Sequence, residues 1–313
     1  MIIITAVLLS GCGYKYDIPY STDSNISGFR MVDFETSEDT VSAFAEKLCI
    51  VSGDVDAKSI EMNEDTAAAL FDVTNKDTIY AKNVHEKMYP ASLTKIMTFI
   101  VAIKHGELDQ VLTASPNACI SDYSVQKIGL KDGDQMTLEQ ALNIMLVYSA
   151  NDVANLIAEG IGGSIENFVA MMNDEALSLG CTETHFVNAN GLTNEEHYTS
   201  PYDLYLMMNE AIQFESFKSI IAKQSYETTY YNVAGNEETA KVESTNLYLS
   251  GQASSPGGIT IVGGKTGTTN AAGHCLIVLS KNASNQTYIS IVMKSESRDG
   301  LYKIMNSMLT KGV

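Results

Sequence analysis

Ser92-Leu-Thr-Lys95 places a hydroxyl and an amine three residues apart. Residues at i and i+3 share one face of a helix, so the Lys95 amine can reach the Ser92 hydroxyl. A lysine whose pKa is lowered by burial or by a neighbouring cation can act as a base and make serine a nucleophile. A helix N-terminus adds N–H groups where an oxyanion develops. Ser92 is therefore a candidate nucleophile, and the alternative is a hydroxyl that only caps the helix.

This pattern is not specific by itself. The chain contains a second segment of the same form, Ser124-Val-Gln-Lys127, which leads into a polar Lys-Asp-Gly-Asp loop. Ser149-Ala-Asn151 lies at the expected end of a helix, where serine can relay a proton and asparagine can hold a substrate amide through its donor and its acceptor. Ser115-Pro-Asn117 and Ser244-Thr-Asn246 match that second pattern too, and an ordinary polar helix end is the alternative for Asn151.

The third segment, Gly263-Gly-Lys-Thr-Gly-Thr268, contains the one Lys-Thr-Gly of the chain. Glycines on a strand allow another backbone to approach closely, as an extended substrate would when it pairs with a sheet edge. Lys265 and Thr266 can hold a carboxylate by charge and by a hydroxyl group. The alternative for this segment is a glycine-rich turn between strands.

The elements that must position these segments can be predicted from their patterns. Residues 66–73 and 78–82 flank a polar turn and indicate a β-hairpin. Pro90 suits a helix start, and apolar residues then recur at helical spacing from Leu93 to Val101. Thr137-Leu-Glu-Gln140 fits a capping box at the start of a second helix.

Strands are expected near the other end of the chain over residues 259–262, 274–280 and 287–294, followed by a helix over 298–309. Strands at both ends with helices between them imply one sheet that is assembled from distant segments. We therefore predict an α/β fold with an antiparallel sheet.

The three segments, in this order, form the set typical of penicillin-binding proteins and β-lactamases. Over roughly residues 66–311 the sequence resembles the serine D-alanyl-D-alanine carboxypeptidases, the low-molecular-weight penicillin-binding proteins. The resemblance extends to Tyr89–Thr98, Ser149–Asp152, Thr184–Leu204 and Gly264–Leu276. It implies a penicillin-binding protein/β-lactamase-like transpeptidase fold, in which helices flank an antiparallel sheet and form a helical subdomain.

The resemblance also implies roles in acyl transfer on peptidoglycan stem peptides that end in D-Ala-D-Ala. Ser92 would attack the penultimate D-Ala carbonyl after Lys95 accepts its proton, and water would later release the shortened peptide. Asn151 would orient the substrate amide, and Ser149 with Lys265 would pass a proton to the leaving amine. β-Lactam antibiotics would bind covalently as inhibitors.

The third segment would bind the substrate through Lys265, Thr266, Gly267 and Thr268. In the family pattern, Lys265 and Thr266 hold the terminal carboxylate. The N–H groups of Ser92 and Thr268 would form the oxyanion hole. No cofactor and no metal are implied.

Two other functions compete with this hypothesis. A class A β-lactamase shares the fold but deacylates with a glutamate on a loop, whereas Thr184–Leu204 resembles the carboxypeptidase segment and Glu195-Glu196 has no matching context. A lipoprotein that binds wall peptides or β-lactams without turnover is the other alternative.

The N-terminus indicates a compartment. Ile2–Leu9 is apolar but too short to span a bilayer in a helix, and it precedes Leu9-Ser-Gly-Cys12, which resembles a bacterial lipobox. No Lys or Arg precedes Cys12, unlike the usual signal peptide, and an edge strand or a frayed tail is the alternative. We expect lipidation of Cys12 and an extracytoplasmic protein on the outer face of the cytoplasmic membrane.

These features divide the chain into a lipoprotein signal peptide (1–12), a tether and N-terminal extension (13–55) and a catalytic domain (56–313). The chain stops at Val313, just after the expected terminal helix, where many relatives carry a β-rich domain and a membrane helix. We therefore expect the lipoprotein form that lacks this domain, with the lipid on Cys12 as its anchor.

The composition of the chain argues against a nucleic-acid partner and against a zinc site. Asp and Glu number 38 against 20 Lys and Arg, so the formal net charge is −18 and a nucleic-acid partner is excluded. The cysteines at 49, 119, 181 and 275 lack zinc-ligand spacing and have apolar neighbours. We expect them to be small buried hydrophobic residues.

Overall fold

A computed structural model describes residues 46–312 of the chain. The expected signal peptide, Cys12 and most of the expected tether lie outside the described residues. No helix in the part that is described is both long and apolar enough to cross a membrane.

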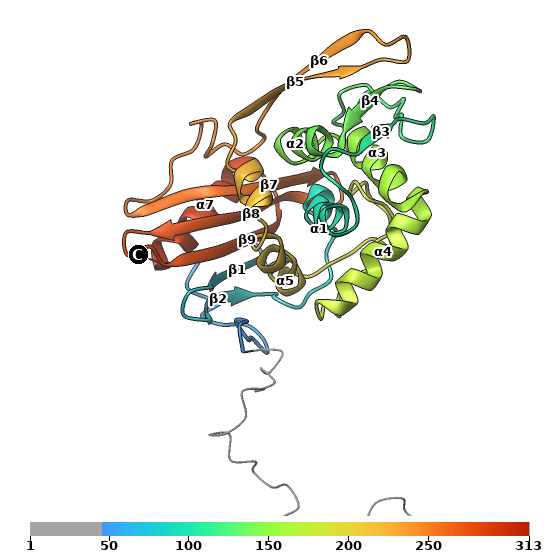
Figure 1. The fold of residues 1–313 in the computed structure, drawn as a ribbon. Helices are drawn as coiled ribbons and strands as arrows, with labels where there is room; N and C mark the ends of the chain where they lie inside the picture. The colour runs from blue at the N-terminus through green and yellow to red at the C-terminus, as the bar shows by residue number, and fades with distance from the viewer. Residues whose placement is uncertain (1–45, 313) are drawn as a thin grey trace, which may run out of the picture. The chain divides into compact units, whose positions relative to one another are not determined.

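An antiparallel five-stranded sheet in the order β2-β1-β9-β8-β7 carries the described structure (Figure 1). The strand nearest the C-terminus, β9, pairs with both β1 and β8, so the two ends of the described chain meet in the centre of one sheet. The predicted hairpin and the three predicted C-terminal strands are confirmed. The strands are β1 (Ala67–Asp72), β2 (Asp77–Lys82), β7 (Ile259–Thr269), β8 (Gly273–Asn282) and β9 (Thr287–Ser295).

The central strands are buried on both faces, which is why they are continuous apolar runs in the sequence. In β9, Ile289 and Ile291 face the larger core, whereas Tyr288 and Val292 face a smaller core under helix α7 (Arg298–Leu309). Figure 1 shows α7 behind the sheet and α1 and α5 in front of it. The sheet is therefore the middle layer between helices, as the α/β prediction requires.

Helices that follow the first hairpin build a second region beside the sheet. The capping box that opens α2 is confirmed, because Thr137 Oγ1 accepts from the Gln140 N–H and the Gln140 side chain accepts from the Thr137 N–H. The helices are η1 (Ala91–Thr94), α1 (Lys95–His105), α2 (Leu138–Tyr148), α3 (Asn151–Gly162), α4 (Ile165–Ser178), α5 (Pro201–Ala211), α6 (Glu215–Ile221) and, at the end, η2 (Thr310–Gly312).

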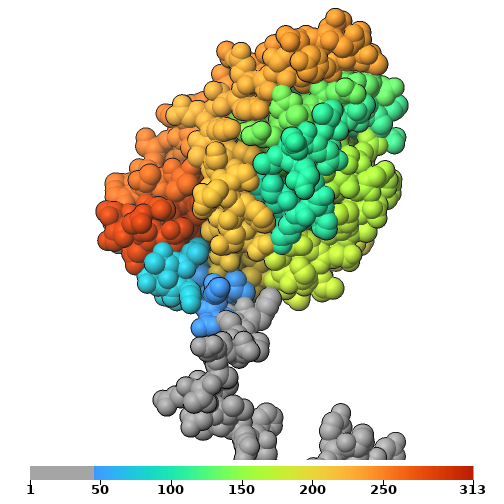
Figure 2. Space-filling view, in the orientation of Figure 1, coloured from blue at the N-terminus to red at the C-terminus, as the bar shows by residue number. Residues whose placement is uncertain are grey.

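A small second sheet, in the order β3-β4-β5-β6, lies at one end of the helical region. Its long hairpin is drawn in orange at the top of Figures 1 and 2, beside the green segments of β3 and β4. The strands are β3 (Val111–Thr113), β4 (Gln135–Thr137), β5 (Ser225–Tyr231) and β6 (Glu237–Glu243).

Two details differ from the sequence-based expectations. The compact unit begins at Lys47 and not at residue 56: Cys49 is fully buried in it, and Val55 pairs with Ala81. Cys49, Cys181 and Cys275 are buried as expected, but Cys119, which directly follows the turn at residues 116–118, is partly exposed.

Candidate active site

The first segment forms the junction of η1 and α1. Ser92 lies in η1 and Lys95 is the first residue of α1. A 3₁₀ turn has three residues per turn, so positions i and i+3 eclipse and the two side chains align more closely than in an α-helix. Lys95 Nζ lies 2.9 Å from Ser92 Oγ, and Lys95 is fully buried while Ser92 stays half-buried.

The remaining contacts of Lys95 determine where its lone pair points. Its Nζ donates to Asn151 Oδ1 at 2.7 Å and to the Asn190 carbonyl at 2.5 Å. A neutral amine has two N–H bonds and one lone pair. In the neutral amine these two acceptors take both N–H bonds, which leaves the lone pair for the Ser92 hydroxyl, the arrangement that a base needs.

The electrostatic surroundings of Lys95 favour the neutral amine. Burial is the largest cause and lowers its pKa well below the ordinary value, the charge of Lys265 lowers the pKa further, and Asp152 opposes both. Burial and a neighbouring cation, the two causes expected for a catalytic lysine in this sequence pattern, thus both lower the pKa of Lys95.

The second segment occupies the sharp turn between α2 and α3. Ser149 has a left-handed backbone, with φ 70° and ψ 29°, so the chain reverses there and Asn151 becomes the first residue of α3. The Asn151 N–H donates to the Gln126 carbonyl at 2.8 Å, and both Ser149 and Asn151 are buried. The turn directs Ser149 and Asn151 at the two lysines.

The third segment lies on β7, at the free edge of the five-stranded sheet. Lys265 Nζ donates to Ser149 Oγ and to the Thr266 carbonyl, both at 2.8 Å. Burial lowers the pKa of Lys265 to about 7. Thr266 is half-buried and its hydroxyl lies 2.5 Å from that of Thr245. The strand prediction is confirmed, and the glycine-rich turn is excluded.

Two glycines let these elements approach each other. A Cβ on Gly267 would lie 3.0 Å from both the Pro90 carbonyl oxygen and the Ser92 nitrogen, so β7 and η1 are almost in backbone contact. A Cβ on Gly191 would lie 1.9 Å from the Ala91 carbonyl oxygen, and Gly191 has a positive φ of 88°. Side chains at either position would displace the segment that carries Ser92.

A cleft of about 850 Å³ opens over the three segments. The structure thus brings together every candidate residue of the described chain. The hydroxyl and amide groups reach the cleft, while Lys95 and Lys265 lie beneath it. The candidate residues in its wall are Ser92, Ser149, Asn151, Thr266, Gly267 and Thr268.

The competing segments of the same patterns do not form such pairs. Ser124 lines the rim of the cleft, but its hydroxyl donates to Asp122 Oδ1 at 2.7 Å, and Lys127 Nζ donates to the Ile120 carbonyl. Ser115 donates to Glu159, and Ser244 Oγ accepts from the Asn246 N–H. Of the serines in these patterns, Ser92 is the one that contacts a lysine of its own segment.

Sequence reasoning missed two contributors to the site. The Asn190 carbonyl, which accepts from Lys95, is a backbone group and has no sequence signal. Arg298 lines the cleft at the first residue of α7. It is one of only two arginines in the chain. The rarity of arginine in a strongly acidic chain was the available signal.

A solved structure shares this fold, and a family model identifies the class of the protein. The Streptomyces K15 DD-transpeptidase superposes with a TM-score of 0.73 for one variant, at 24% sequence identity over 81% of this chain and 99% of that one. The family model of the D-alanyl-D-alanine carboxypeptidases, peptidase S11, matches residues 55–297. The chain belongs to this family, and the transpeptidase-like fold expected from the three segments is confirmed.

Curated relatives carry the same family description. The D-alanyl-D-alanine carboxypeptidase DacF of Bacillus subtilis is 32% identical over 80% of this chain and 61% of its own length. DacC of Escherichia coli is 28% identical over 87% of this chain and 64% of its own. The Streptomyces K15 carboxypeptidase is 27% identical over 73% of this chain and 81% of its own. The chain spans less than two thirds of the length of DacF and DacC.

Proposed function

We propose that this protein is a serine D-alanyl-D-alanine carboxypeptidase that removes the terminal D-Ala from peptidoglycan stem pentapeptides. The observation that carries the proposal is the 2.9 Å contact between the fully buried Lys95 Nζ and Ser92 Oγ, with Asn151 Oδ1 and the Asn190 carbonyl as the other acceptors around the same amine. The family of the chain and the names of its relatives agree with this activity.

Acylation begins when Lys95 takes the Ser92 proton and Oγ attacks the penultimate D-Ala carbonyl carbon. The N–H groups of Ser92 and Thr268 receive the oxyanion, and the close approach of β7 to η1 at Gly267 supports this pairing. Asn151 Oδ1 accepts from Lys95, which orients the amide and leaves Nδ2 to hold the substrate amide.

The terminal carboxylate then lies at Lys265 and Thr266. The Ser149–Lys265 hydrogen bond of 2.8 Å supports passage of a proton through Ser149 to the leaving amine. The C–N bond breaks and D-Ala leaves. A water molecule adds to the acyl ester, Ser92 recovers its proton, and the shortened peptide departs. A β-lactam follows the first step and forms the same ester with Ser92.

The two alternative functions have less support. A class A β-lactamase deacylates with a glutamate, and no glutamate lines the cleft within residues 46–312. A protein that only binds wall peptides, without acylation, has no need for a fully buried lysine 2.9 Å from a serine hydroxyl.

One comparison of substrates tests the proposal. The full chain is incubated with diacetyl-Lys-D-Ala-D-Ala and, separately, with a chromogenic cephalosporin. We expect release of D-Ala and slow or single turnover of the cephalosporin. Rapid cephalosporin hydrolysis without D-Ala release would assign the β-lactamase function. Penicillin labelling without turnover of either compound would assign the binding function.

The location of the protein belongs to the same proposal. The stem-peptide substrate is extracytoplasmic, and a lipid on Cys12 would hold the protein at the outer face of the cytoplasmic membrane. The lipobox-like Leu9–Cys12 supports this anchor.

A further inference from the structure

Lys294, near the end of β9, has a backbone conformation that L side chains rarely adopt. Its φ is 59°, in the left-handed region that favours glycine. The pairing of β8 with β9 is irregular at this place, since His274 pairs with Ser295 but Leu276 pairs with Val292. One residue of β8 thus lies opposite two residues of β9, which defines a β-bulge that contains Lys294. The surrounding structure must hold this strained conformation.

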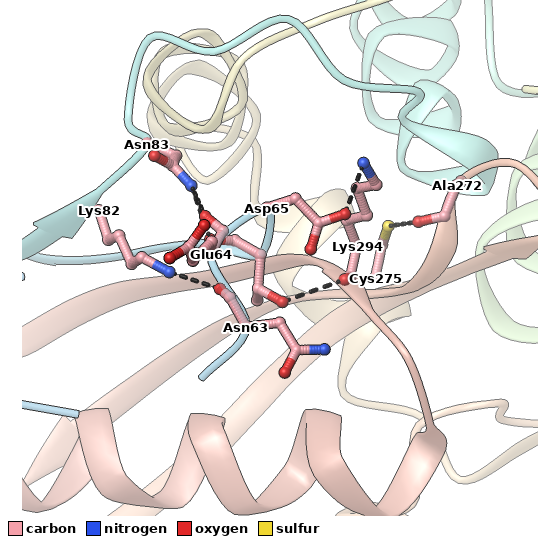
Figure 3. A network of polar contacts seen from close by, with 9 residues as sticks. Asn63, Glu64, Asp65, Lys82, Asn83, Ala272, Cys275 and Lys294 are labelled. Carbon is pink, nitrogen blue, oxygen red and sulfur yellow. Dashed lines mark hydrogen bonds and ion pairs between the residues drawn. The ribbon is translucent and has the colours of Figure 1, made fainter. Parts of the chain in front are cut away.

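The bulge is held from two sides. Lys294 Nζ pairs with Asp65 at 2.8 Å, and the Thr66 hydroxyl donates to the Lys294 carbonyl at 3.2 Å. On the other side, the Cys275 thiol donates to the Ala272 carbonyl at 3.5 Å. Burial raises the pKa of this thiol to about 11, and a hydrogen bond from the Lys294 backbone opposes the rise. Figure 3 shows Lys294 between Asp65 and Cys275.

The buried contacts constrain Lys294 more than its charge does. The side chains of Lys294 and Asp65 are both exposed, and an ion pair of this kind stabilises little. Thr66 and Cys275 are buried, so their hydrogen bonds to the Lys294 backbone are stronger than they would be in water. A substitution of Lys294 should therefore act mainly through the backbone.

The bulge sets the direction in which the chain leaves the sheet toward α7. Three residues separate Lys294 from Arg298, the first residue of α7. Ser295 Oγ donates to the Ser297 carbonyl at 3.1 Å, and Ser297 Oγ accepts from the Gly300 N–H at 3.0 Å. These contacts leave the short connection little freedom, so a change of direction at Lys294 would move the start of α7.

The start of α7 is one wall of the catalytic cleft, to which Arg298, Leu301 and Tyr302 contribute. The Arg298 guanidinium forms no ion pair within residues 46–312, so its charge is available to an anion that enters the cleft. The stem peptide and the β-lactams both carry a carboxylate, and this step of the argument rests on the proposed function.

We propose that Lys294 is a positioning residue, whose left-handed conformation directs the start of α7 to the cleft and thereby places the Arg298 charge where an anionic ligand enters. Lys294 acts through the backbone, since its side chain pairs with Asp65 and does not line the catalytic cleft. A side chain that is incompatible with the left-handed region should weaken ligand capture, whereas loss of the ion pair alone should not.

Labelled benzylpenicillin tests the proposal, because the dependence of labelling on its concentration separates the dissociation constant from the rate of acylation of Ser92. Lys294→Val introduces a β-branched side chain that is strongly disfavoured at positive φ. We expect it to raise the dissociation constant several-fold and to leave the acylation rate nearly unchanged. Lys294→Gly adopts the conformation without strain but loses the ion pair, so both constants should stay near those of the wild type.

Lys76 provides the matched control. It is also an exposed lysine in the left-handed region, with φ 58°, but it lies in the turn between β1 and β2 and does not line the cleft. Lys76→Val should lower the thermal stability and leave the dissociation constant unchanged. Equal increases of the dissociation constant in Lys76→Val and Lys294→Val would reduce the effect to general destabilisation and overturn the inference.

A double variant separates positioning from a merely structural role. If Lys294 acts through Arg298, Lys294→Val should raise the dissociation constant in the wild type but not in Arg298→Gln. An equal increase in both backgrounds would refute the inference, as would a wild-type dissociation constant in the folded valine variant. If Lys294→Val does not fold, Thr66→Val, which removes the hydroxyl that holds the Lys294 carbonyl, is judged by the same criteria.

The labelling of Ser92 does not require release of D-Ala. If the protein releases no D-Ala, the proposed function fails, while the dissociation constants still decide whether Lys294 positions Arg298.

Discussion

Ser92 and Ser124 share a sequence pattern and line the same cleft, but their neighbours differ. Ser92 lies 2.9 Å from Lys95, whereas the Ser124 hydroxyl donates to Asp122. We therefore expect labelled penicillin to attach to the wild type and to Ser124→Ala, and not to Ser92→Ala. Denaturing gels after labelling provide the measurement. Labelling that survives in Ser92→Ala and vanishes in Ser124→Ala would refute the assignment.

Lys95 is expected to act through its neutral form. Lys95→Arg keeps a cation that cannot deprotonate, so the acylation rate should fall about 10²- to 10⁴-fold. Stopped-flow acylation by a chromogenic β-lactam measures this rate, and thermal unfolding checks that the variant is folded. Near-normal acylation by the folded arginine variant would remove Lys95 from the role of base.

Lys265 should set the alkaline limit of activity. Its pKa is lowered to about 7 by burial, and the protonated amine is the form that attracts the substrate carboxylate. Above this pH the free enzyme loses that charge, so kcat/KM for D-Ala release should decline as pH rises through about 7. Lys265→Arg stays protonated and should shift the decline to higher pH. The control Lys218→Arg, a partly exposed lysine in α6 that pairs with Glu215, should leave the profile unchanged, and a wild-type profile that is flat to pH 9 would contradict the assignment.

At the scale of single residues, the candidates predicted from the sequence meet around one cleft, whereas Arg298 and the Asn190 carbonyl were not predicted. Hydroxyl and amine side chains at fixed spacings are visible in a sequence. The Asn190 carbonyl was not predictable, because every residue has a carbonyl and only the folded chain places this one beside Lys95.

At the scale of elements, the segment between α4 and α5 lines the cleft through residues 191–193, and His197 holds this segment in position. This histidine is almost fully buried, its Nε2 donates to Thr94 Oγ1 at 2.8 Å, and its Nδ1 accepts from the Val187 N–H. It therefore ties residues 185–199 to the segment that carries Ser92 and Lys95.

The pKa of His197 is lowered to about 4, mainly by burial. The folded state keeps it neutral while the unfolded chain binds a proton below about 6.5, so stability present at neutral pH is lost as pH falls from 6.5 toward 4. The loss amounts to about 3 kcal/mol for this residue. Urea unfolding of wild type and His197→Gln across this range measures it. We expect the difference between the two free energies of unfolding to shrink at acid pH, and a constant difference would contradict the linkage.

The elements themselves were predictable where the patterns are local. The capping box predicted the start of α2, and the continuous apolar runs predicted strands β8 and β9. The 3₁₀ geometry of η1 was not predictable, since it depends on Gly191 and Gly267 allowing distant backbones to touch the segment.

For the whole molecule, the lipobox hypothesis predicts attachment to the membrane through a lipid on Cys12. Stable anchoring requires more than one acyl chain, because each buried CH₂ contributes about 0.8 kcal/mol and a single chain binds only marginally. We expect Cys12→Ser to block acylation and to leave an unprocessed or secreted protein. Membrane fractionation and mass spectrometry of the N-terminus measure both effects. A variant that fractionates with membranes like the parent and shows no unprocessed N-terminus would rule out the lipobox hypothesis.

The free edge of β7 has a consequence for solubility. A strand whose outer N–H and C=O groups must stay open for a peptide is equally open to a strand of another copy, which is how edge strands seed aggregation. The formal charge of −18 keeps copies apart at neutral pH, but this protection vanishes near the pI of about 4.6. Concentrated preparations should thus precipitate first on mild acidification, and a covalently bound β-lactam along β7 should delay that precipitation.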